Sequence, residues 1–289
     1  GGGDVRIEAG RDITGAPSTQ LFSDWLFRQG RTDADGAAYL TGQQGTPAWW
    51  ERFDQFAQGV GALGGGDATL QAGRDITNVA AHSPTQGRMG SATPSASQLV
   101  KTGGGDVRVE AGRNVLGGQY FADQGSVDLA ARGRIGSGQS SLLGRVYPVI
   151  ALGDGEASAR ANADLELHGV VNPTLVVQSF GANDNANVRS NAQGAQRISI
   201  FSTYGDQSGA RLESLTGDTV LHDVSGSSSG GVSPLYTPYP IFGTAIPSVN
   251  SYRTLLGYLP PNLAMTAYSG DVKVAEVAVG GSPAGGTEG

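Results

Sequence analysis

Three stretches of the chain share one alternation of apolar and polar residues. They read GGGDVRIEAGRDITG at 1–15, GGGDATLQAGRDITN at 64–78 and GGGDVRVEAGRNVLG at 103–117. In the first stretch, Val5, Ile7 and Ala9 alternate with Arg6 and Glu8. A period of two residues predicts a β-strand that buries one face and exposes the other. A Gly–Arg corner follows each strand, and the next apolar residue begins a second short strand.

The same alternation predicts which side chains of the other copies face inward. We expect Leu70 and Val109 to lie in the core and Thr69 and Arg108 to face solvent. A shift of one residue would bury an arginine without a partner. If the copies are neighbours, one outward column comprises Glu8, Gln71 and Glu110, with a neutral residue between two acids.

The spacing of the copies indicates how they assemble. A fourth, weaker copy, GSVDLAARGRI at 125–135, lies 20 residues after the third, and the other offsets are 63 and 39 residues. The offsets of 63 and 39 residues are close to three times and twice a unit of 20 residues. A single unit cannot bury its own apolar face, so the units must stack, with strands about 4.8 Å apart. The sequence therefore predicts an all-β fold, a single parallel β-helix (β-solenoid) of about 20-residue coils over residues 1–280.

Residues 16–62 interrupt this repeat, and their apolar residues recur at helical spacing. Ser18 is a candidate N-cap of one helix, and Thr46 of a second helix that begins at Pro47. The apolar faces would comprise Leu21, Phe22, Trp25 and Leu26 in the first helix, and Trp49, Phe53, Phe56 and Val60 in the second. We expect both faces, including Trp49 and Phe53, to pack against the flank of the solenoid.

The aromatic residues of the excursions have a second interpretation as binding residues. All three tryptophans of the chain, Trp25, Trp49 and Trp50, lie in residues 16–62 and would form an aromatic platform for a sugar or a partner. Residues 225–262 are rich in Ser, Gly, Pro and Tyr, and Tyr236 and Tyr239 are further candidates. Loops on a rigid scaffold often carry recognition, and a solvated loop without a partner is the alternative.

Two further stretches fall outside the repeat. Residues 79–102 are predicted to form a polar loop, and residues 281–289 to form a flexible tail. The sequence opens on a Gly inside a motif, with no signal peptide before it. We therefore expect a segment of a longer protein.

Composition narrows the class of protein. Glycine supplies 47 of 289 residues and apolar residues 38%, which suits a narrow, elongated core with many turns. The absence of cysteine suits a chain that crosses an oxidising periplasm unfolded, and it excludes thiol chemistry. The formal net charge of −7, with only two lysines, argues against nucleic acid as a partner.

The sequence predicts no catalytic, cofactor-binding or metal-binding residues. A β-helix enzyme that acts on polysaccharides needs several acids gathered on one face. The repeated acids Asp4, Asp67 and Asp106 stack beside glycines at a corner, where hydrogen bonds to nearby backbone N–H groups explain them better. The three histidines have no metal-ligand spacing along the chain and are expected at surface or turn positions; they are His82, His168 and His222.

The repeats resemble those of filamentous-haemagglutinin-like exoproteins of Gram-negative bacteria. The runs WWERFDQFAQGVGALGGGDATLQAGRDITN and LPPNLAMTAYSGDVKV add to this resemblance, which covers most of the chain. It implies a right-handed β-helix that reaches the cell surface or medium by two-partner secretion. The implied transport partner is an outer-membrane barrel, engaged through an N-terminal secretion domain that this sequence lacks.

The resemblance also implies a function in virulence without chemistry. We expect a structural or adhesive segment of a large exoprotein that mediates adhesion or aggregation, with a glycan or protein of a host or bacterial surface as its partner. Two alternatives stay open. One is a polysaccharide lyase or hydrolase on the same fold, and the other is a passive stalk that presents a toxin or binding domain located elsewhere in the parent chain.

Overall fold

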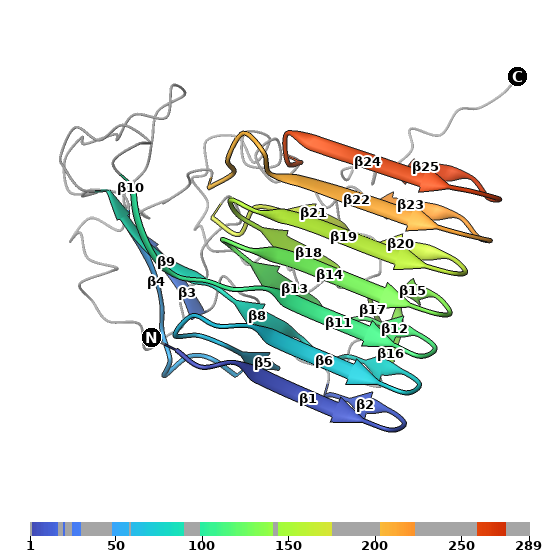
Figure 1. The fold of residues 1–289 in the computed structure, drawn as a ribbon, viewed down its shortest axis with the longest axis horizontal. Helices are drawn as coiled ribbons and strands as arrows, with labels where there is room; N and C mark the ends of the chain where they lie inside the picture. The colour runs from blue at the N-terminus through green and yellow to red at the C-terminus, as the bar shows by residue number, and fades with distance from the viewer. Residues whose placement is uncertain are drawn as a thin grey trace, which may run out of the picture.

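A computed structural model describes residues 2–16, 20, 25–29, 48–57, 59–89, 99–140, 144–174, 203–222 and 259–275. These residues are almost entirely strands and turns, with almost no helix. Most strands belong to three long parallel sheets, and in Figure 1 the strands of each sheet are stacked one above another. The protein is therefore all-β, and its parallel sheets are compatible with a β-helix or solenoid.

The first sheet contains seven strands in the order β1-β6-β11-β14-β19-β22-β24. Their bounds are β1 Val5–Ala9, β6 Ala68–Ala72, β11 Val107–Ala111, β14 Ser126–Ala131, β19 Glu156–Ala161, β22 Gly209–Ser214 and β24 Asn262–Ala267. The order in the sheet is the order along the chain. Each strand therefore lies between the preceding and the following copy of the same sequence pattern (Figure 1).

The second and third sheets follow the same rule. The second comprises β2 Ile13–Thr14, β7 Ile76–Thr77, β12 Val115–Leu116, β15 Ile135–Gly136, β20 Leu165–Leu167, β23 Thr219–His222 and β25 Val272–Ala275. The third comprises β5 Val60–Gly61, β8 Ala81–Ser83, β13 Gln119–Ala122, β18 Val149–Leu152 and β21 Gly169–Val171. We call one strand of the first sheet and the strands that follow it in the other sheets a tier. The described residues form seven tiers, from β1–β2 to β24–β25.

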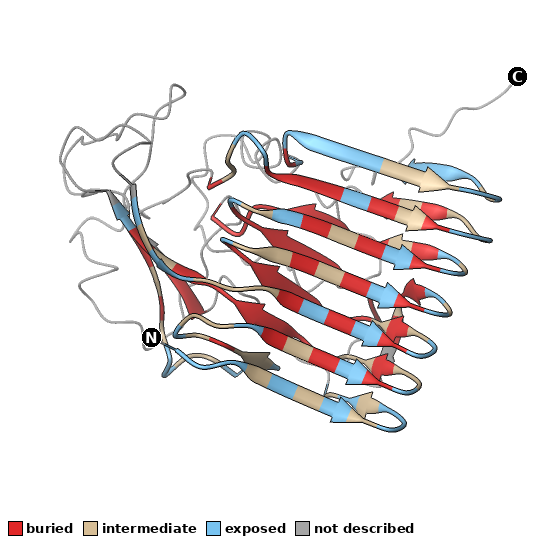
Figure 2. Cartoon of the chain, viewed as in Figure 1, coloured by how far each residue is buried: buried red, intermediate tan, exposed pale blue. Residues whose placement is uncertain are grey.

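The register of the first sheet confirms the predicted strand phase. Val107 pairs with Ala68 on one side and with Val127 on the other. Leu70 and Val109 are fully buried, whereas Arg108 is exposed and Thr69 is half-buried. Figure 2 shows this alternation of buried and exposed positions along the strands of the first sheet. The predicted column of Glu8, Gln71 and Glu110 is also present.

In the first sheet the 20-residue spacing holds between only one pair of tiers, although β18 and β21 of the third sheet also pair 20 residues apart. Hydrogen-bonded positions on adjacent tiers lie 20 residues apart between β11 and β14, and 63, 39, 30 and 53 residues apart elsewhere. Insertions account for the longer separations. One of them is a hairpin of β16 Gly138–Ser140 and β17 Gly144–Val146, between β15 and β18.

The predicted helices of residues 16–62 are wrong where the structure describes this segment. It contains β3 Leu26–Gln29 and β4 Ala48–Glu51, paired antiparallel. Trp49 is buried as expected, but Phe53 is 62% exposed. The spacing of the aromatic residues fitted a helix because alternation on a short strand, followed by a turn, produces a similar pattern. Ser18, Thr46 and Pro47 lie outside the described residues.

The polar loop predicted for residues 79–102 is also incorrect in its described part. This segment contains β8 of the third sheet, followed by β9 Thr85–Met89 and β10 Leu99–Gly103, which pair antiparallel. With β3 and β4 they form a four-stranded sheet in the order β10-β9-β4-β3, here called the covering sheet. Residues 225–258 of the predicted Pro/Tyr-rich loop and the predicted tail at 281–289 lie outside the described residues.

Candidate binding surfaces

The stacked acids at the corner before the first sheet form a ladder of hydrogen bonds between tiers. Asp4 Oδ1 accepts the backbone N–H of Asp67 at 2.9 Å, and Asp67 Oδ1 accepts that of Asp106 at 2.8 Å. Asp106 Oδ1 in turn accepts the N–H of Ser126 at 2.8 Å. The predicted role in bonding backbone N–H groups is confirmed, but the N–H groups belong to the next tier.

A second ladder runs along the corner before the second sheet. Five side chains accept the backbone N–H of the next tier at 2.9–3.1 Å, namely Asp12, Asp75, Asn114, Asp164 and Asp218. Arg134 interrupts this ladder, since it occupies the same position in the fourth tier. Both rows of side chains thus hold neighbouring tiers together.

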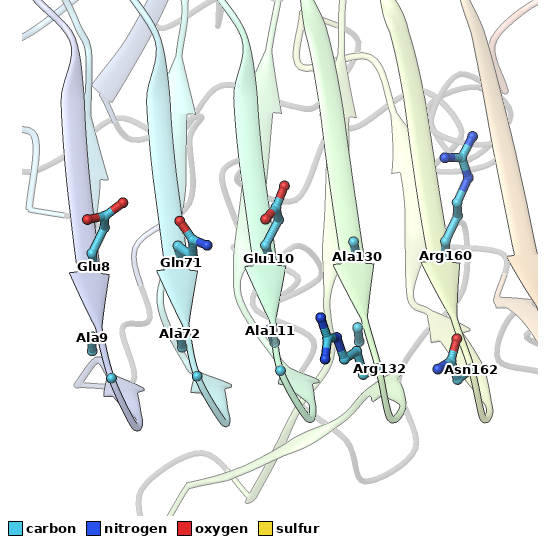
Figure 3. Close-up of a pocket in the computed structure, with 14 residues that line it drawn as sticks. Glu8, Ala9, Gln71, Ala72, Glu110, Ala111, Ala130, Arg132, Arg160 and Asn162 are labelled. Atoms are coloured by element: carbon cyan, nitrogen blue, oxygen red, sulfur yellow. The ribbon is translucent and has the colours of Figure 1, made fainter.

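An open groove of about 740 Å³ runs along the outer face of the first sheet and the corner that follows it. It crosses the first five tiers, and Figure 3 shows its side chains in successive rows. Its lining includes Glu8, Gln71, Glu110, Arg132, Arg160 and Asn162, with glycines at the corners of the first three tiers. The groove was not predicted, because it depends on which outward columns lie beside which corner.

Charge is distributed unevenly along this groove. Glu8 and Glu110 lie at one end on either side of Gln71, and Arg132 and Arg160 lie toward the other end (Figure 3). The Arg160 Nε atom donates to Glu213 Oε2 at 3.1 Å, so this cation is partly neutralised. The surface offers amide, carboxylate and guanidinium groups in one line, which suits an elongated polar ligand.

The covering sheet packs its large side chains on the outer face of the third sheet. Trp25, Leu26 and Trp49 form a buried cluster with Phe121 and Val149. The Trp49 indole N–H donates to Thr85 Oγ1 at 3.2 Å, which satisfies its polar atom inside the protein. Burial on both sides explains why all four residues of β13 and of β18 are inaccessible to solvent.

This packing decides what the predicted aromatic candidates contact. Trp25 is 0% exposed and Trp49 is 2% exposed, so neither side chain is available to a ligand in this conformation. Trp50 is half-buried, while Tyr236 and Tyr239 lie outside the described residues. The burial of the two tryptophans favours the packing role over the aromatic platform.

Beside this cluster lies a network of buried polar groups. The Asp123 carboxylate accepts hydrogen bonds from the Thr85 and Thr203 hydroxyls, the second at 3.2 Å. Burial raises the pKa of Asp123, and it also raises the pKa of Glu51 nearby. Lys101 is close enough to oppose the shift at Asp123, and its Nζ pairs with Asp154 at 2.9 Å. The network joins the third sheet to the covering sheet.

Two of the three histidines occupy equivalent positions on adjacent tiers. The rings of His168 and His222 stack with centroids 5.7 Å apart, and Tyr147 lies 5.0 Å from His168. His222 Nε2 is 2.9 Å from Glu166 Oε1. Burial, aided by His222, lowers the pKa of His168 to about 4.

The prediction that all three histidines are surface or turn residues is wrong for His82. It is fully buried on β8, 5.1 Å from the Trp25 ring. Neither the His168–His222 stack nor the Asp123 network was predicted. His168 and His222 follow Leu167 and Leu221, which pair in register, so the stack could have been inferred once the tiers were aligned. Asp123 carries no such sequence signal.

Among the described residues, no group of three or more His, Asp or Glu side chains is placed to hold a metal ion. In the same part of the chain, no helix is long and apolar enough to cross a membrane.

No family model, curated protein or solved structure matches this chain.

Proposed function

We propose that this chain is a structural and adhesive segment of a secreted exoprotein, built as a right-handed parallel β-helix. The observation that carries the proposal is the stack of seven tiers with one polar, exposed face. An inward column of apolar residues runs through the tiers, and hydrogen-bond ladders join most pairs of neighbouring tiers, as a rod requires. Such a rod gains length with each tier added.

Two observations support the right-handed winding. In Figure 1 the strands of the first sheet run from left to right at the front, the third sheet lies behind, and later tiers lie above earlier ones. A path that moves right in front, left behind and upward turns in a right-handed sense. Connections between parallel strands of one sheet are also right-handed in nearly all proteins.

The outer face of the first sheet is the surface best suited to adhesion. The third sheet is covered by aromatic packing from the covering sheet. The outward positions of the first sheet, by contrast, carry polar residues, such as Arg108 and Glu110, that are exposed (Figure 2). The groove crosses five tiers on this face, so a ligand bound there would lie along the rod. We assign adhesion to a glycan or protein of a cell surface to this groove.

Secretion by an outer-membrane transporter and residence at a Gram-negative cell surface are parts of the same proposal. The resemblance of the repeats to those of filamentous-haemagglutinin-like exoproteins supports them. The lack of cysteine supports export through an oxidising periplasm in an unfolded state. The transporter would be engaged by a part of the exoprotein outside this sequence.

A bead-binding assay tests adhesion. Beads coated with the chain should bind epithelial cells or bacteria, and a Glu8→Ala, Gln71→Ala, Glu110→Ala triple variant should reduce binding about tenfold, as loss of central contacts does elsewhere. Gln124→Ala, on an exposed turn outside the groove, is the matched control. If native beads bind no better than uncoated beads, the adhesive function is wrong and the passive stalk becomes the better proposal.

The second candidate function is a polysaccharide hydrolase, which one feature of the groove favours. Glu8 and Glu110 flank Gln71, so their strands are two spacings, about 9.6 Å, apart. Two carboxyl groups about 6.5–9.5 Å apart are typical of inverting glycosidases. However, both side chains are exposed, and a carboxyl that acts as a general acid near neutral pH is usually buried. Release of new reducing ends from polysaccharides, lost in Glu110→Gln, would support this candidate over adhesion.

A further inference from the structure

The groove on the outer face of the first sheet contains two opposite charges that the described residues do not neutralise. Arg6 Nε donates to Glu8 Oε1 at 2.7 Å, and Arg160 is also held in an ion pair. Within the described part of the chain, by contrast, neither the Glu110 carboxylate nor the Arg132 guanidinium forms a hydrogen bond or an ion pair. Both side chains are exposed and line the groove (Figure 3). These two groups are therefore available to a ligand.

An exposed apolar side chain continues the line of the groove toward later tiers. The backbone N–H groups of Arg132, Asn162 and Leu215 each donate to the last residue of the preceding strand in the first sheet. The three residues therefore stand one above another at the corner that follows this sheet. Leu215 is 51% exposed, although its tier is covered by the next one through the pairing of β22 with β24. Its exposure is thus a property of the outer face.

The groups that face this line recur two tiers apart. Gln71, which pairs in register with Glu110, belongs to the second tier, Arg132 to the fourth and Leu215 to the sixth. Two tier spacings are about 9.6 Å. A segment in the polyproline II conformation presents the same face every three residues, about 9.3 Å, whereas a β-strand does so every two residues, about 6.8 Å. The spacing therefore matches a polyproline II segment and not a β-strand.

The charges of the groove distinguish between classes of ligand. A cation near Glu110, an anion at Arg132 and an apolar group on Leu215 would complement the surface. A polypeptide supplies all three kinds of side chain in one molecule. Glycans carry mainly hydroxyl, amide and acidic groups, so a glycan would place no cation opposite the Glu110 carboxylate. The charge pattern therefore favours a polypeptide.

We propose that the groove binds a polypeptide segment of a cell-surface protein, which lies along the rod in the polyproline II conformation. The segment carries a cationic, an acidic and an apolar side chain at intervals of three residues. The cation lies over Gln71 and reaches Glu110, the acid lies over Arg132, and the apolar side chain lies over Leu215. Prolines between these positions would pre-organise the segment and lower the entropic cost of binding. This inference rests on the adhesive function assigned to the groove above.

Fluorescence anisotropy with labelled peptides tests the order of the charges. The peptide GKPPEPPLG has the proposed pattern, and GEPPKPPLG has the same composition with the two charges exchanged. The 289-residue chain should bind the first peptide about fivefold more tightly than the second, as expected when exposed charge pairs are lost. Because the groove does not fix the direction of the segment, GLPPEPPKG is compared with GLPPKPPEG in the same way. Equal binding within both pairs of peptides overturns the proposal.

A charge exchange between protein and peptide tests the position of the acid. Arg132→Glu should weaken binding of the tighter peptide about fivefold, and replacing the central Glu of that peptide by Lys should restore it. Restored binding requires a folded protein, so an unfolded variant cannot imitate this result. Arg88→Glu is the matched control, because it reverses the same charge at an exposed site of β9 outside the groove. If Arg132→Glu binds both peptides as the native chain does, the ligand lies elsewhere and the proposal is wrong.

Attachment to cells separates the nature of the ligand from adhesion itself. An excess of the tighter peptide should block attachment of beads coated with the chain. If beads attach although no peptide binds, adhesion stands, but the polypeptide ligand is wrong and a glycan takes its place. If the peptide binds in the predicted order of charges but beads attach to no cell, the ligand class is supported and the adhesive function is wrong.

Discussion

Asp75 and Asn114 occupy equivalent corner positions on adjacent tiers, and one oxygen of Asp75 accepts two hydrogen bonds from Asn114. The backbone N–H of Asn114 lies 3.1 Å from Asp75 Oδ1, and its side-chain Nδ2 lies 3.0 Å from the same oxygen. The Arg113 guanidinium binds the same carboxylate at 2.7 Å through Nε. Asp75 therefore joins the second and third tiers through both backbone and side-chain contacts.

This arrangement makes stability depend on pH in the acid range. The Arg113 guanidinium and the Asn114 groups hold the pKa of Asp75 below its usual value of 3.8. A carboxyl whose pKa is lowered on folding stabilises the fold above its unfolded pKa, and the contribution is lost as pH falls through the folded pKa. Asp75→Asn should lower stability at pH 7 by about 1–3 kcal/mol. The loss should shrink below pH 4, as measured by urea unfolding, and a pH-independent loss would contradict it.

The strand phase predicts opposite results at neighbouring positions. Val109→Asp should cost several kcal/mol, because a carboxylate without a counter-charge would be buried between Leu70 and Leu129. Arg108→Gln should change stability by no more than about 0.5 kcal/mol, since the side chain is exposed. Glutamine is a better control than aspartate, because Arg108 pairs in register with Asp128. Melting temperatures of the two variants check the prediction, and a reversed order would exclude this phase.

Two aromatic residues four positions apart should differ in their contribution to stability. Trp49→Ala should cost about 3–5 kcal/mol, because the side chain is enclosed by the covering sheet and the third sheet. Phe53→Ala should be almost neutral, within about 0.5 kcal/mol, because Phe53 faces solvent. Thermal unfolding measured for both variants distinguishes this arrangement from a helix, in which the two residues would share one buried face.

His168 should make the protein less stable in mild acid. Its pKa is about 4 in the folded protein and 6.5 as the ordinary value. A histidine whose pKa is lowered on folding favours the unfolded state once that state takes up a proton. Stability should therefore fall from pH 6.5 toward pH 4, by up to about 3 kcal/mol at 1.36 kcal/mol per pH unit. His168→Gln should flatten this part of the unfolding profile, and an unchanged slope would assign the effect to other groups.

The sequence was sufficient for the first and second sheets because a period of two residues and a repeated motif report directly on strand phase and stacking. Val109 and Arg108 were assigned to the correct faces for that reason. The covering sheet was missed because its strands carry no copy of the repeated motif, and β3 and β4 have only four residues each. On β4, Trp49 and Glu51 both face inward, and a four-residue alternation is too short to exclude a helix. The groove and the Asp123 network depend on residues that are far apart in the sequence, which no local pattern brings together.

Each hydrogen bond of the two ladders has a direction, because the carboxylate or amide oxygen of an earlier tier accepts the backbone N–H of a later tier. A completed tier therefore presents acceptors, in fixed positions, to the segment that follows it in the chain. The next segment can form its strands on that template instead of nucleating alone, and its new contacts involve mainly the tier just completed. A chain that emerges from a narrow exit with its N-terminal side first would consequently fold as it appears, and each added tier would hinder its return.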